Sequence, residues 1–427
     1  MLIIVFKIWD VKIFSCHPNK FNVIIHYTQV QRRISLIATG IVVEYNPFHN
    51  GHLFHLNEAK RLTNANVIIA VMSGHFLQRG EPAIVDKWTR TRMALAGGAD
   101  LVIELPYAFS TAHAPKFAKG SVQILDALQC KYICFGSEEG SIAPFTNSLD
   151  TMDTNKELYE KTIMSSVQEG ISYPNALRIA YEEISRTTDE PLADLSEPNN
   201  ILGFHYMQSA REIRSDMTPV TIARKGTHFH DEALPENSIA SATGIRKELF
   251  ATDTEHVQTF MPPASFKLLK QLPHQSWDHL YPFLRYTILR EGPEQLALIA
   301  DITEGIEFSI WRAAKQYSTF QLFMQAVKSK RYTWTRIQRM LVHILTGYRK
   351  TTRAQISSPS YLRLLGISEN GRSYLRSVKK ELPLPLISRA GSHKDPSLLM
   401  DIKSTDIYMC GIQREPGLDF KTPPILL

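Results

Sequence analysis

The fold of this chain is decided by the stretch LIATGIVVEYNPFHNGHL, residues 36–53. Its first part, Leu36–Glu44, is a short apolar run rich in β-branched residues, which is typical of a strand buried on both faces. The turn YNPFHNG follows, and apolar residues at helical spacing from His52 to Thr63 then predict an amphipathic helix. A buried strand that enters a helix through a tight turn predicts the first half of a βαβ unit.

The same alternation of strand and helix continues to residue 135. Further strands are predicted at Asn66–Met72, Leu101–Leu105 and Tyr132–Phe135. The intervening helices are predicted at Lys87–Ala96 and Ala114–Leu128. This spacing predicts an α/β fold with a parallel sheet and right-handed crossovers, a Rossmann-like unit. Such sheets bind ligands at the carboxyl ends of their strands, and polar or glycine-containing clusters follow each predicted strand.

The second half of the chain has a different pattern. Residues 148–250 are mostly helical in pattern, with one strand-like run at Val220–Ala223. Beyond about residue 255 the pattern is almost entirely helical, and prolines separate the segments. We therefore expect a Rossmann-like domain over 36–255, followed by a mainly α-helical C-terminal domain over 256–427.

Composition places the chain among ordinary globular proteins. It has 427 residues, a net charge of +6, 44% hydrophobic residues and 21% charged residues, which suggests two or three domains. No run of about 18 apolar residues is present, so no membrane span is predicted. The four cysteines, Cys16, Cys130, Cys134 and Cys410, have no His or Cys neighbours that complete a metal set. We therefore predict that all four are reduced thiols in a cytoplasmic protein, and we predict no metal site.

Positive charge is concentrated in one block. Between Lys328 and Arg389 there are fourteen Lys and Arg against two acids. The block therefore carries +12, which leaves about −6 for the rest of the chain. Its interleaved aromatic residues are Tyr332, Trp334, Tyr348, Tyr361 and Tyr374. This composition suits a polyanion that also offers bases for stacking, and a solvated helical face is the open alternative.

The turn after the first strand carries the element H-x-G-H, formed by His49, Gly51 and His52. Gly51 lets the backbone approach a ligand, and the helix that begins near His52 points its free N–H groups into the same space. Two imidazoles there can donate hydrogen bonds to phosphate and stabilise the charge of departing pyrophosphate. We predict that this turn binds ATP for attack at the α-phosphate, with His49 and His52 as the catalytic residues. Helix-capping histidines and a metal-binding pair are the alternatives.

The loop MSGHFLQRGEP, residues 72–82, follows the second strand. Its polar members could hold a carboxylate or phosphate, or pack as a structural loop; they are Ser73, Gly74, His75, Gln78 and Arg79. Just downstream, Lys87 and Arg90 could contact phosphate or carry surface charge.

Three later clusters could serve the same ligand. In FGSE, residues 135–138, a glycine would let adenine or ribose approach the backbone. In EPNNILG, residues 197–203, asparagines could bind a base edge or cap a helix. In SIASATGIR, residues 238–246, small hydroxyl residues open a helix with Arg246 one turn along. That arrangement can form a second anion cradle, although Ser241 or Thr243 is also an ordinary N-cap residue.

An early H-x-G-H element with a late Ser/Thr–I–R helix start is the signature of the HIGH-type nucleotidyltransferase superfamily. Its members attack ATP at the α-phosphate and release pyrophosphate. More closely, the chain resembles the tRNA(Met) cytidine acetate ligase family, and the resemblance covers nearly all of the chain except residues 1–35. The matching runs are GIVVEYNPFHNGHL, VMSGHFLQRGEPA, DLVIELPY, FGSE, PNNILG, SIASATGIRK and KRYTWTRIQRMLVHILT.

The resemblance implies a reaction in two steps. Acetate and ATP would give acetyl-adenylate and pyrophosphate, with Mg2+ accompanying ATP. The acetyl group would then pass to the amine of the wobble cytidine in elongator tRNA(Met), and AMP would be released. Residues 36–255 would thus be the ATP-binding and adenylation domain, and residues 256–427 the tRNA-binding domain. No membrane and no protein partner are implied.

The resemblance also implies site residues. ATP contacts are expected from Val42, Val43, Glu44, Tyr45, Asn46, Pro47, Phe48, His49, Asn50, Gly51, His52, Leu53, Phe54, His55, Gly136, Asn199, Arg224 and Lys225. Phosphate contacts are expected from Ser241, Thr243 and Arg246. The tRNA contacts expected in the basic segment are Lys330, Arg331, Trp334, Arg336 and Arg339.

Two competing interpretations remain open at this point. A small-molecule adenylyltransferase of the same superfamily would share the H-x-G-H element, but a small substrate does not need a basic helical half. A tRNA-binding protein with a vestigial nucleotide site would need no intact His49, Gly51, His52 and Arg246, and all four are present.

Residues 1–35 show no clear periodicity, and Leu36 stands about where relatives have their initiator methionine. They form either an appendage or a segment translated from upstream of the true start. We expect the second, with translation beginning at a non-AUG codon. Mass spectrometry of the native protein should then find no peptide from residues 1–30, and a single such peptide would contradict the expectation.

Overall fold

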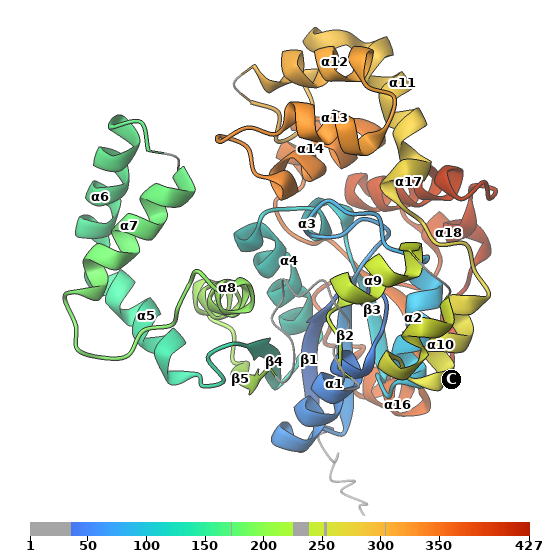
Figure 1. Cartoon of the computed structure of the whole chain (residues 1–427). Coiled ribbons are helices and arrows are strands. Elements are labelled where there is room, and N and C mark those ends of the chain that lie inside the picture. Colours follow the sequence, from blue (N-terminus) through green and yellow to red (C-terminus); the bar gives the residue numbers. More distant parts are fainter. Residues whose placement is uncertain (1–35, 172, 225–238, 252–253, 304) are drawn as a thin grey trace, which may run out of the picture. The chain divides into compact units, whose positions relative to one another are not determined.

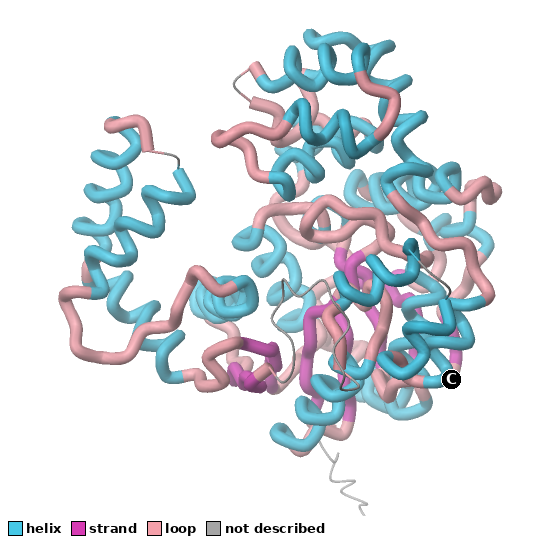
Figure 2. Tube along the Cα trace, viewed as in Figure 1, coloured by secondary structure: helices cyan, strands magenta, loops and turns pink. Residues whose placement is uncertain are grey.

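One sheet organises the part of the chain that the structure describes. The computed structural model describes residues 36–427 except 172, 225–238, 252–253 and 304. Among the described residues the sheet has eight strands, which Figure 2 shows in magenta. They are β1 (Ala38–Val43), β2 (Val67–Ser73), β3 (Leu101–Leu105), β4 (Tyr132–Ser137), β5 (Thr218–Ala223), β6 (Leu362–Ile367), β7 (Leu386–Ile387) and β8 (Ile425–Leu426).

The strand order is β5-β4-β1-β2-β3-β6-β7, with β8 also paired to β6. The first five strands along this order are all parallel, which confirms the predicted Rossmann-like sheet. Helices α1 (Asn50–Thr63), α2 (Lys87–Ala96) and α4 (Ala114–Ala127) connect successive strands as predicted. The carboxyl ends of β1 and β2 therefore lie next to each other, and the H-x-G-H turn leaves from the first of them.

Both faces of the sheet are covered by helices (Figure 1). Along β2, alternate residues enter two different cores, because successive side chains of a strand point to opposite faces. Ile68 and Met72 join the core with α1, α2, α9 (Ala242–Ala251) and α10 (Pro263–Lys270). Ile69 and Val71 join the core with α4, α8 (Pro198–Glu212) and α16 (Glu369–Val378). A strand buried on both faces explains why its sequence is continuously apolar.

The region beyond residue 255 is not purely helical. β6 pairs antiparallel with β3, and β7 and β8 pair with β6. The run LRLLGI of β6 lacks a strict alternation and contains Arg363, so its pattern did not distinguish a strand from a helix. Residues 36–427 belong to one compact unit. The boundary expected at residue 255 thus does not separate two compact bodies, and a tRNA-binding role for residues 256–427 stays a prediction.

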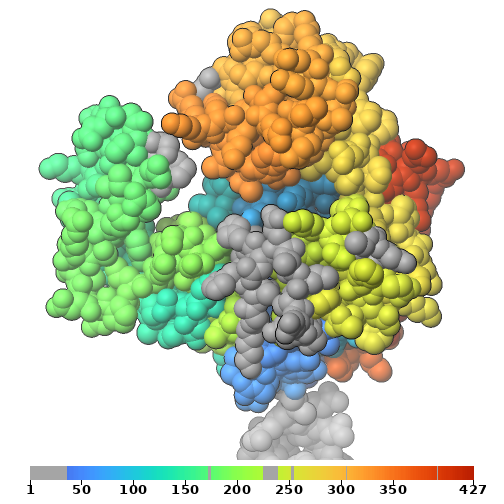
Figure 3. Space-filling model, in the orientation of Figure 1, coloured from blue at the N-terminus to red at the C-terminus, as the bar shows by residue number. Residues whose placement is uncertain are grey.

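The remaining described segments are mostly helical, as expected. In Figure 3 the α6–α7 pair and the α11–α14 group cover separate regions of the surface. The helices not yet introduced are α3 (Tyr107–Ser110), α5 (Ala143–Thr154), α6 (Lys156–Gln168), α7 (Tyr173–Ser185), α11 (Trp277–Leu296), α12 (Ile306–Gln316), α13 (Phe320–Val327), α14 (Trp334–Thr346), α15 (Lys350–Gln355), α17 (Pro396–Gly411) and α18 (Leu418–Lys421).

The aromatic residues of the basic block do not lie on the surface. Tyr332, Tyr348, Tyr361 and Tyr374 are all buried. Trp334 is half-buried and packs against the same core as three of them. The idea that the four tyrosines are free to stack on bases is therefore wrong, because the fold uses them as core residues, whereas stacking by Trp334 stays a prediction.

Cys130, Cys134 and Cys410 are free thiols, whereas Cys16 lies outside the described residues. Within the described ranges, no helix combines the length and the apolar character needed to cross a membrane.

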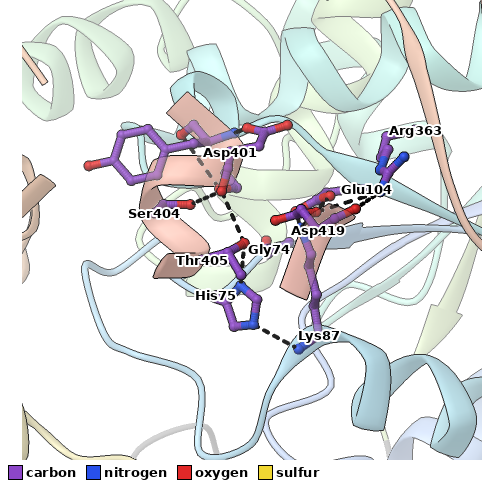
Figure 4. A network of polar contacts seen from close by, with 12 residues as sticks. Gly74, His75, Lys87, Glu104, Arg363, Asp401, Ser404, Thr405 and Asp419 are labelled. Carbon is purple, nitrogen blue, oxygen red and sulfur yellow. Dashed lines mark hydrogen bonds and ion pairs between the residues drawn. The ribbon is translucent and has the colours of Figure 1, made fainter. Parts of the chain in front are cut away.

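A buried ion network joins the two ends of the described chain (Figure 4). Lys87 Nζ lies 2.7 and 2.8 Å from the carboxylate oxygens of Glu104 and 2.9 Å from Asp419 Oδ1. Arg363 Nη2 lies 3.6 Å from the same Asp419 oxygen. These groups belong to α2, β3, α18 and β6, and none of the side chains is more than 3% exposed. Both expectations for Lys87, phosphate contact and surface charge, are therefore wrong.

Burial and the neighbouring charges act on the pKa values of these groups. Burial opposes the charge of Lys87, but Asp419 and Glu104 outweigh it and raise the pKa of Lys87. Burial and then Glu104 raise the pKa of Asp401, whose carboxylate accepts hydrogen bonds from the Tyr361 hydroxyl and the Tyr107 N–H. Lys87 and Arg363 therefore stabilise the buried carboxylates of this network.

Replacing Lys87 with Met should lower the free energy of unfolding by about 3–5 kcal/mol, because two buried carboxylates lose their shared cation. Urea unfolding of the variant and the parent measures this. The matched control is Lys379→Met, which removes an exposed lysine and should change stability by no more than ~0.5 kcal/mol. Equal midpoints for Lys87→Met and the parent would contradict the role given to the network.

Candidate nucleotide site

The two histidines of the H-x-G-H element cap α1. The helix begins at Asn50, two residues earlier than expected, which makes His49 its N-cap residue. The Gly51 N–H donates to His49 Nδ1 at 3.0 Å, and the His49 N–H donates to His52 Nδ1 at 3.3 Å. The capping alternative is therefore confirmed.

Capping also fixes what each imidazole can offer to a ligand. Because Nδ1 accepts a backbone hydrogen bond in both rings, the neutral form carries its proton on Nε2. Each histidine is then an Nε2–H donor, which suits phosphate oxygens and does not suit a cation. The ring centroids lie 3.8 Å apart, so the two donors belong to one small region.

Both histidines are held uncharged. Burial, followed by the charges of Arg224 and Arg246, lowers the pKa of His49 to about 3. Burial and the neighbouring His49 and His55 lower the pKa of His52 well below its usual value. Burial and Arg224 lower the pKa of His55 to about 4. Among the described residues around these rings, positive charge at neutral pH therefore comes from Arg224 and Arg246 and not from imidazolium.

Gly51 is required by the packing of His49. A Cβ at residue 51 would lie 2.8 Å from His49 Cε1 and 3.0 Å from Nδ1. A side chain at this position would therefore displace the ring that caps the helix. Two neighbouring aromatic residues expected at the ATP site, Tyr45 and Phe48, are buried and pack around His52, with Tyr45 at 5.0 Å between centroids. They support the His52 ring from the protein side.

The turn before α1 is fixed from three directions. Ile84 N–H donates to Asn46 Oδ1 at 2.7 Å, and Arg246 Nη1 donates to the Asn46 carbonyl at 3.0 Å. Gln78 N–H donates to Glu44 Oε1 at 2.8 Å, and burial raises the pKa of Glu44. The turn after β1 is therefore held by hydrogen bonds from the loop after β2 and from Arg246 of α9.

Arg90 is the residue that sequence reasoning placed least well. It is fully buried, and its guanidinium donates to the carbonyls of Glu44 and Ser73 at 2.7 and 2.9 Å, and also to Gly74. Neither phosphate contact nor surface charge describes it. Arg90 joins the carboxyl ends of β1 and β2. In the sequence, only its position on the side of α2 that faces the sheet could have indicated this role.

Four residues expected to bind ATP come together beside α1. A Cβ at Gly136 would lie 3.7 Å from the Arg224 side chain and 3.8 Å from His55 Cδ2. Arg224 Nη1 donates to Asn199 Oδ1 at 3.3 Å. His55 Nε2 is buried and has no hydrogen-bond partner among the described residues. Lys225, the remaining member of this expected set, lies outside the described residues.

Glu138 and Asn200 hold this group in place, whereas the sequence predicted a base contact or a helix cap for the asparagines of EPNNILG and no such role for Glu138. Glu138 accepts hydrogen bonds from the Asn199 side chain and from the Asn200 N–H. Asn200 Oδ1 in turn accepts from the N–H groups of Glu138 and Glu139 at 3.0 and 3.1 Å. The start of α8 is thus clamped to the end of β4. The acidic residue at the end of FGSE was the available signal.

The loop MSGHFLQRGEP is mainly structural. His75 is buried, its Nε2 accepts from Lys87 N–H at 3.3 Å, and its Nδ1 lies 3.1 Å from Thr405 Oγ1. Both of its ring nitrogens therefore have partners within the protein, which corrects its expected place in a substrate loop. Gly80, with φ +75°, packs directly against the α14 backbone at Gln338 and Arg339, where a Cβ would not fit.

The start of α9 combines a cap with a charged contact. Ser241 Oγ accepts from Gly244 N–H at 2.9 Å, as an N-cap does. Arg246 Nη2 lies 3.0 Å from Glu81 Oε2 and 3.5 Å from Thr243 Oγ1. Arg246 thus lies beside the H-x-G-H turn, while its phosphate role and those of Ser241 and Thr243 stay predictions.

The residues expected to contact tRNA differ in exposure. Lys330 and Arg331 are exposed, whereas Trp334 and Arg339 are half-buried. Arg336 donates to Thr303 Oγ1 at 3.2 Å and lies over the Tyr332 ring. Their role in tRNA binding stays a prediction. Among the described residues, no group of three or more His, Cys, Asp or Glu is placed to hold a metal ion.

A parallel sheet whose first strand leads into a helix capped by an H-x-G-H element defines a nucleotidyltransferase. Residues 36–418 match the family described as HIGH Nucleotidyl Transferase. A solved structure described as Thermotoga maritima TmcAL bound with alpha-thio ATP is similar, with a TM-score of 0.83 and 31% identity. The similarity covers 92% of this chain and 100% of that one.

Curated relatives narrow the class to one family. A protein of Lysinibacillus sphaericus named tRNA(Met) cytidine acetate ligase is 50% identical over 91% of this chain and 99% of its own length. The Bacillus subtilis protein of the same name is 43% identical over 90% of this chain and 94% of its own. The chain belongs to the tRNA(Met) cytidine acetate ligase family.

The ring of His49 should stay neutral in the free protein between pH 7 and pH 5, because its pKa is lowered to about 3. Ring 15N chemical shifts, assigned with a His49→Asn variant, should report the Nε2–H form throughout this range. The denatured protein is the control, in which histidines titrate near ~6.5. A His49 transition centred near ~6.5 in the folded protein would contradict the hydrogen-bond pattern.

Proposed function

We propose that this chain is an ATP-dependent ligase that uses acetate to acetylate the wobble cytidine of elongator tRNA(Met). The observation that carries the proposal is the pair of neutral Nε2–H donors at the start of α1, with Arg224 and Arg246 beside them. Further support comes from the names of the relatives and from the ATP analogue in the similar Thermotoga maritima structure.

In the first step an acetate oxygen attacks the α-phosphorus of ATP. The new P–O bond forms as the bond to the β-phosphate oxygen breaks, and pyrophosphate leaves with that electron pair. Negative charge grows on the pyrophosphate, so fixed donors aimed at it lower the barrier. His49 and His52 would supply two N–H donors, and the N-terminus of α1 would add its free N–H groups and dipole.

In the second step the N4 amine of the cytidine attacks the carbonyl carbon of acetyl-adenylate. A C–N bond forms, the C–O bond to the phosphate breaks, and AMP leaves with the electron pair while N4 loses a proton. AMP is already a good leaving group, so a strong base on the enzyme is not needed. The target base must leave its stack to reach the site.

The adenosine part of ATP would lie beside Gly136. The missing side chain at residue 136 leaves the strand end open between His55 and Arg224. His55 Nε2 and the Asn199 side chain would then hydrogen-bond the nucleotide, and Arg224 would face its phosphates. Arg246, with Ser241 and Thr243 at the α9 start, would hold the β- and γ-phosphates.

Mg2+ is expected with ATP, because substrate phosphates and water are its usual ligands at such sites. The histidines fit this arrangement, since their Nε2–H groups bind phosphate oxygens and leave the ion to the phosphates. When bound, the ion would supply positive charge at the departing pyrophosphate. We place the reaction in the cytoplasm, where ATP, acetate and tRNA meet.

Replacing His52 should separate its two roles. His52→Asn keeps an acceptor for the His49 N–H but loses the Nε2–H donor, so acetate-dependent pyrophosphate release should fall by about 10²–10³-fold. His52→Gln keeps a donor near Nε2 and should retain more activity than His52→Asn.

The matched control is His279→Ala, which removes an exposed histidine of α11 and should leave the rate unchanged. Mass analysis of tRNA(Met) after incubation with ATP and acetate tests the second step. Unchanged pyrophosphate release in His52→Asn would remove His52 from catalysis. Transfer of AMP to a small molecule, with no acetylated tRNA, would favour the small-molecule adenylyltransferase.

A further inference from the structure

A basic groove lies between α4, α8 and α15. Its volume is about 540 Å³, and it is lined by four cationic side chains, Lys116, Lys119, Lys350 and Arg353. His113 also lines it, and Glu212 is the one acidic residue among its described lining residues. Two of the cations come from the sheet-forming half of the chain and two from the basic block. The fold thus gathers positive charge from segments more than two hundred residues apart.

The charges in the groove are only partly compensated. Lys119 Nζ is 3.9 Å from Glu212, with both side chains about half exposed, a contact that contributes little in water. Arg353 pairs with Asp301, and Lys350 donates to the Ala297 carbonyl at 2.7 Å. Lys116 lies over the ring of Phe109, 5.4 Å from its centroid. Among the described residues, four cations thus face one groove that presents a single acid of its own.

The pKa of Lys116 reflects the concentration of positive charge in the groove. Burial, followed by the charge of Arg353, lowers the pKa of Lys116 to about 8, although Asp301 acts in the opposite direction. A lysine with a lowered pKa is one whose positive charge is not fully stabilised by its surroundings. An anion bound in the groove would supply the missing stabilisation.

The groove is connected to the catalytic turn through one residue. Gln78 N–H donates to Glu44 Oε1 at 2.8 Å, and Gln78 Nε2 donates to the Ala112 carbonyl at 3.1 Å. Glu44 begins the catalytic turn, and Ala112 precedes His113 of the groove. An RNA strand whose phosphates lie in the groove would therefore need only a few nucleotides to extend from the groove to the ATP site.

We propose that this groove binds the phosphodiester backbone of the tRNA substrate next to the reacting cytidine. The proposal rests on the proposed function, and it assigns the backbone contact to Lys116, Lys119, Lys350 and Arg353. Phosphates suit the groove better than bases do, because four cations line it, whereas Phe109 is buried beneath Lys116 and His113 is the one other aromatic ring among its described lining residues. The contact is therefore electrostatic and independent of base sequence.

The first test removes two exposed cations of the groove, in a Lys119→Ala/Lys350→Ala variant. At about 150 mM salt its Kd for tRNA(Met) should rise by about tenfold or more, and its salt dependence should weaken by about two ion equivalents. The matched control is Lys379→Ala/Lys380→Ala, which removes two exposed lysines of the same basic block outside the groove. The control should change the Kd by less than about twofold.

The second test has the opposite sign. Glu212→Gln removes the acid of the groove and should tighten tRNA binding, by about twofold to fivefold. A misfolded variant would not bind RNA more tightly, so this result separates the charge of the groove from general damage. An unchanged Kd in the double variant, an equal loss in the control, or weaker binding by Glu212→Gln would each overturn the proposal.

Two further readouts separate the groove from other sites and from the reaction itself. If the double variant weakened ATP binding and left the Kd for tRNA unchanged, the groove would be a nucleotide site and the proposal would be wrong. If the parent protein acetylated no tRNA while the double variant still lost RNA affinity, the proposed function would fail and the groove would stand. Acetylation by the parent with an unchanged Kd in the double variant would overturn the groove alone.

Discussion

One buried guanidinium holds together the ends of the strands from which the site is built. Arg90 donates to the carbonyls of Glu44, which directly follows β1, of Ser73, the last residue of β2, and of Gly74 in the loop after it. An unsatisfied carbonyl inside the protein is costly, and Arg90 supplies a donor to each of these three. Because the Arg90 guanidinium fixes the ends of both strands, the turn that carries His49 and His52 starts from a defined position.

Much of the fold follows from the periodicity of the sequence, and the exceptions have physical reasons. β2 and β3 were predictable because a strand covered on both faces must be continuously apolar, and α2 because its boundaries are marked by a cap and a glycine. β6 was not, because its Arg363 is buried against Asp419, a residue 56 positions away. No local pattern reveals a charge whose partner arrives from the end of the chain.

The candidate site divides in the same way. The residues alone pointed to His49, Gly51 and His52, because glycines and paired polar residues at strand ends indicate a ligand, and the family resemblance then singled out Gly136, Asn199 and Arg224. The supporting residues Arg90, Glu138 and Asn200 were not, since each acts on backbone groups or side chains of another segment. The aromatic residues of the basic block misled for a related reason. Composition alone does not distinguish a ring on the surface from a tyrosine in the core.

Active sites commonly weaken the proteins that contain them, because groups kept ready for a ligand lack partners in its absence. The start of α1 avoids much of this conflict. One nitrogen of each imidazole closes the helix, as a serine or aspartate cap would, and the other nitrogen would, under the proposed function, contact the substrate. Mutations that weaken the site at these two positions therefore also weaken the helix. Selection for a stable protein and selection for an active enzyme then act in the same direction, and these histidines can persist even where the demand for activity is low.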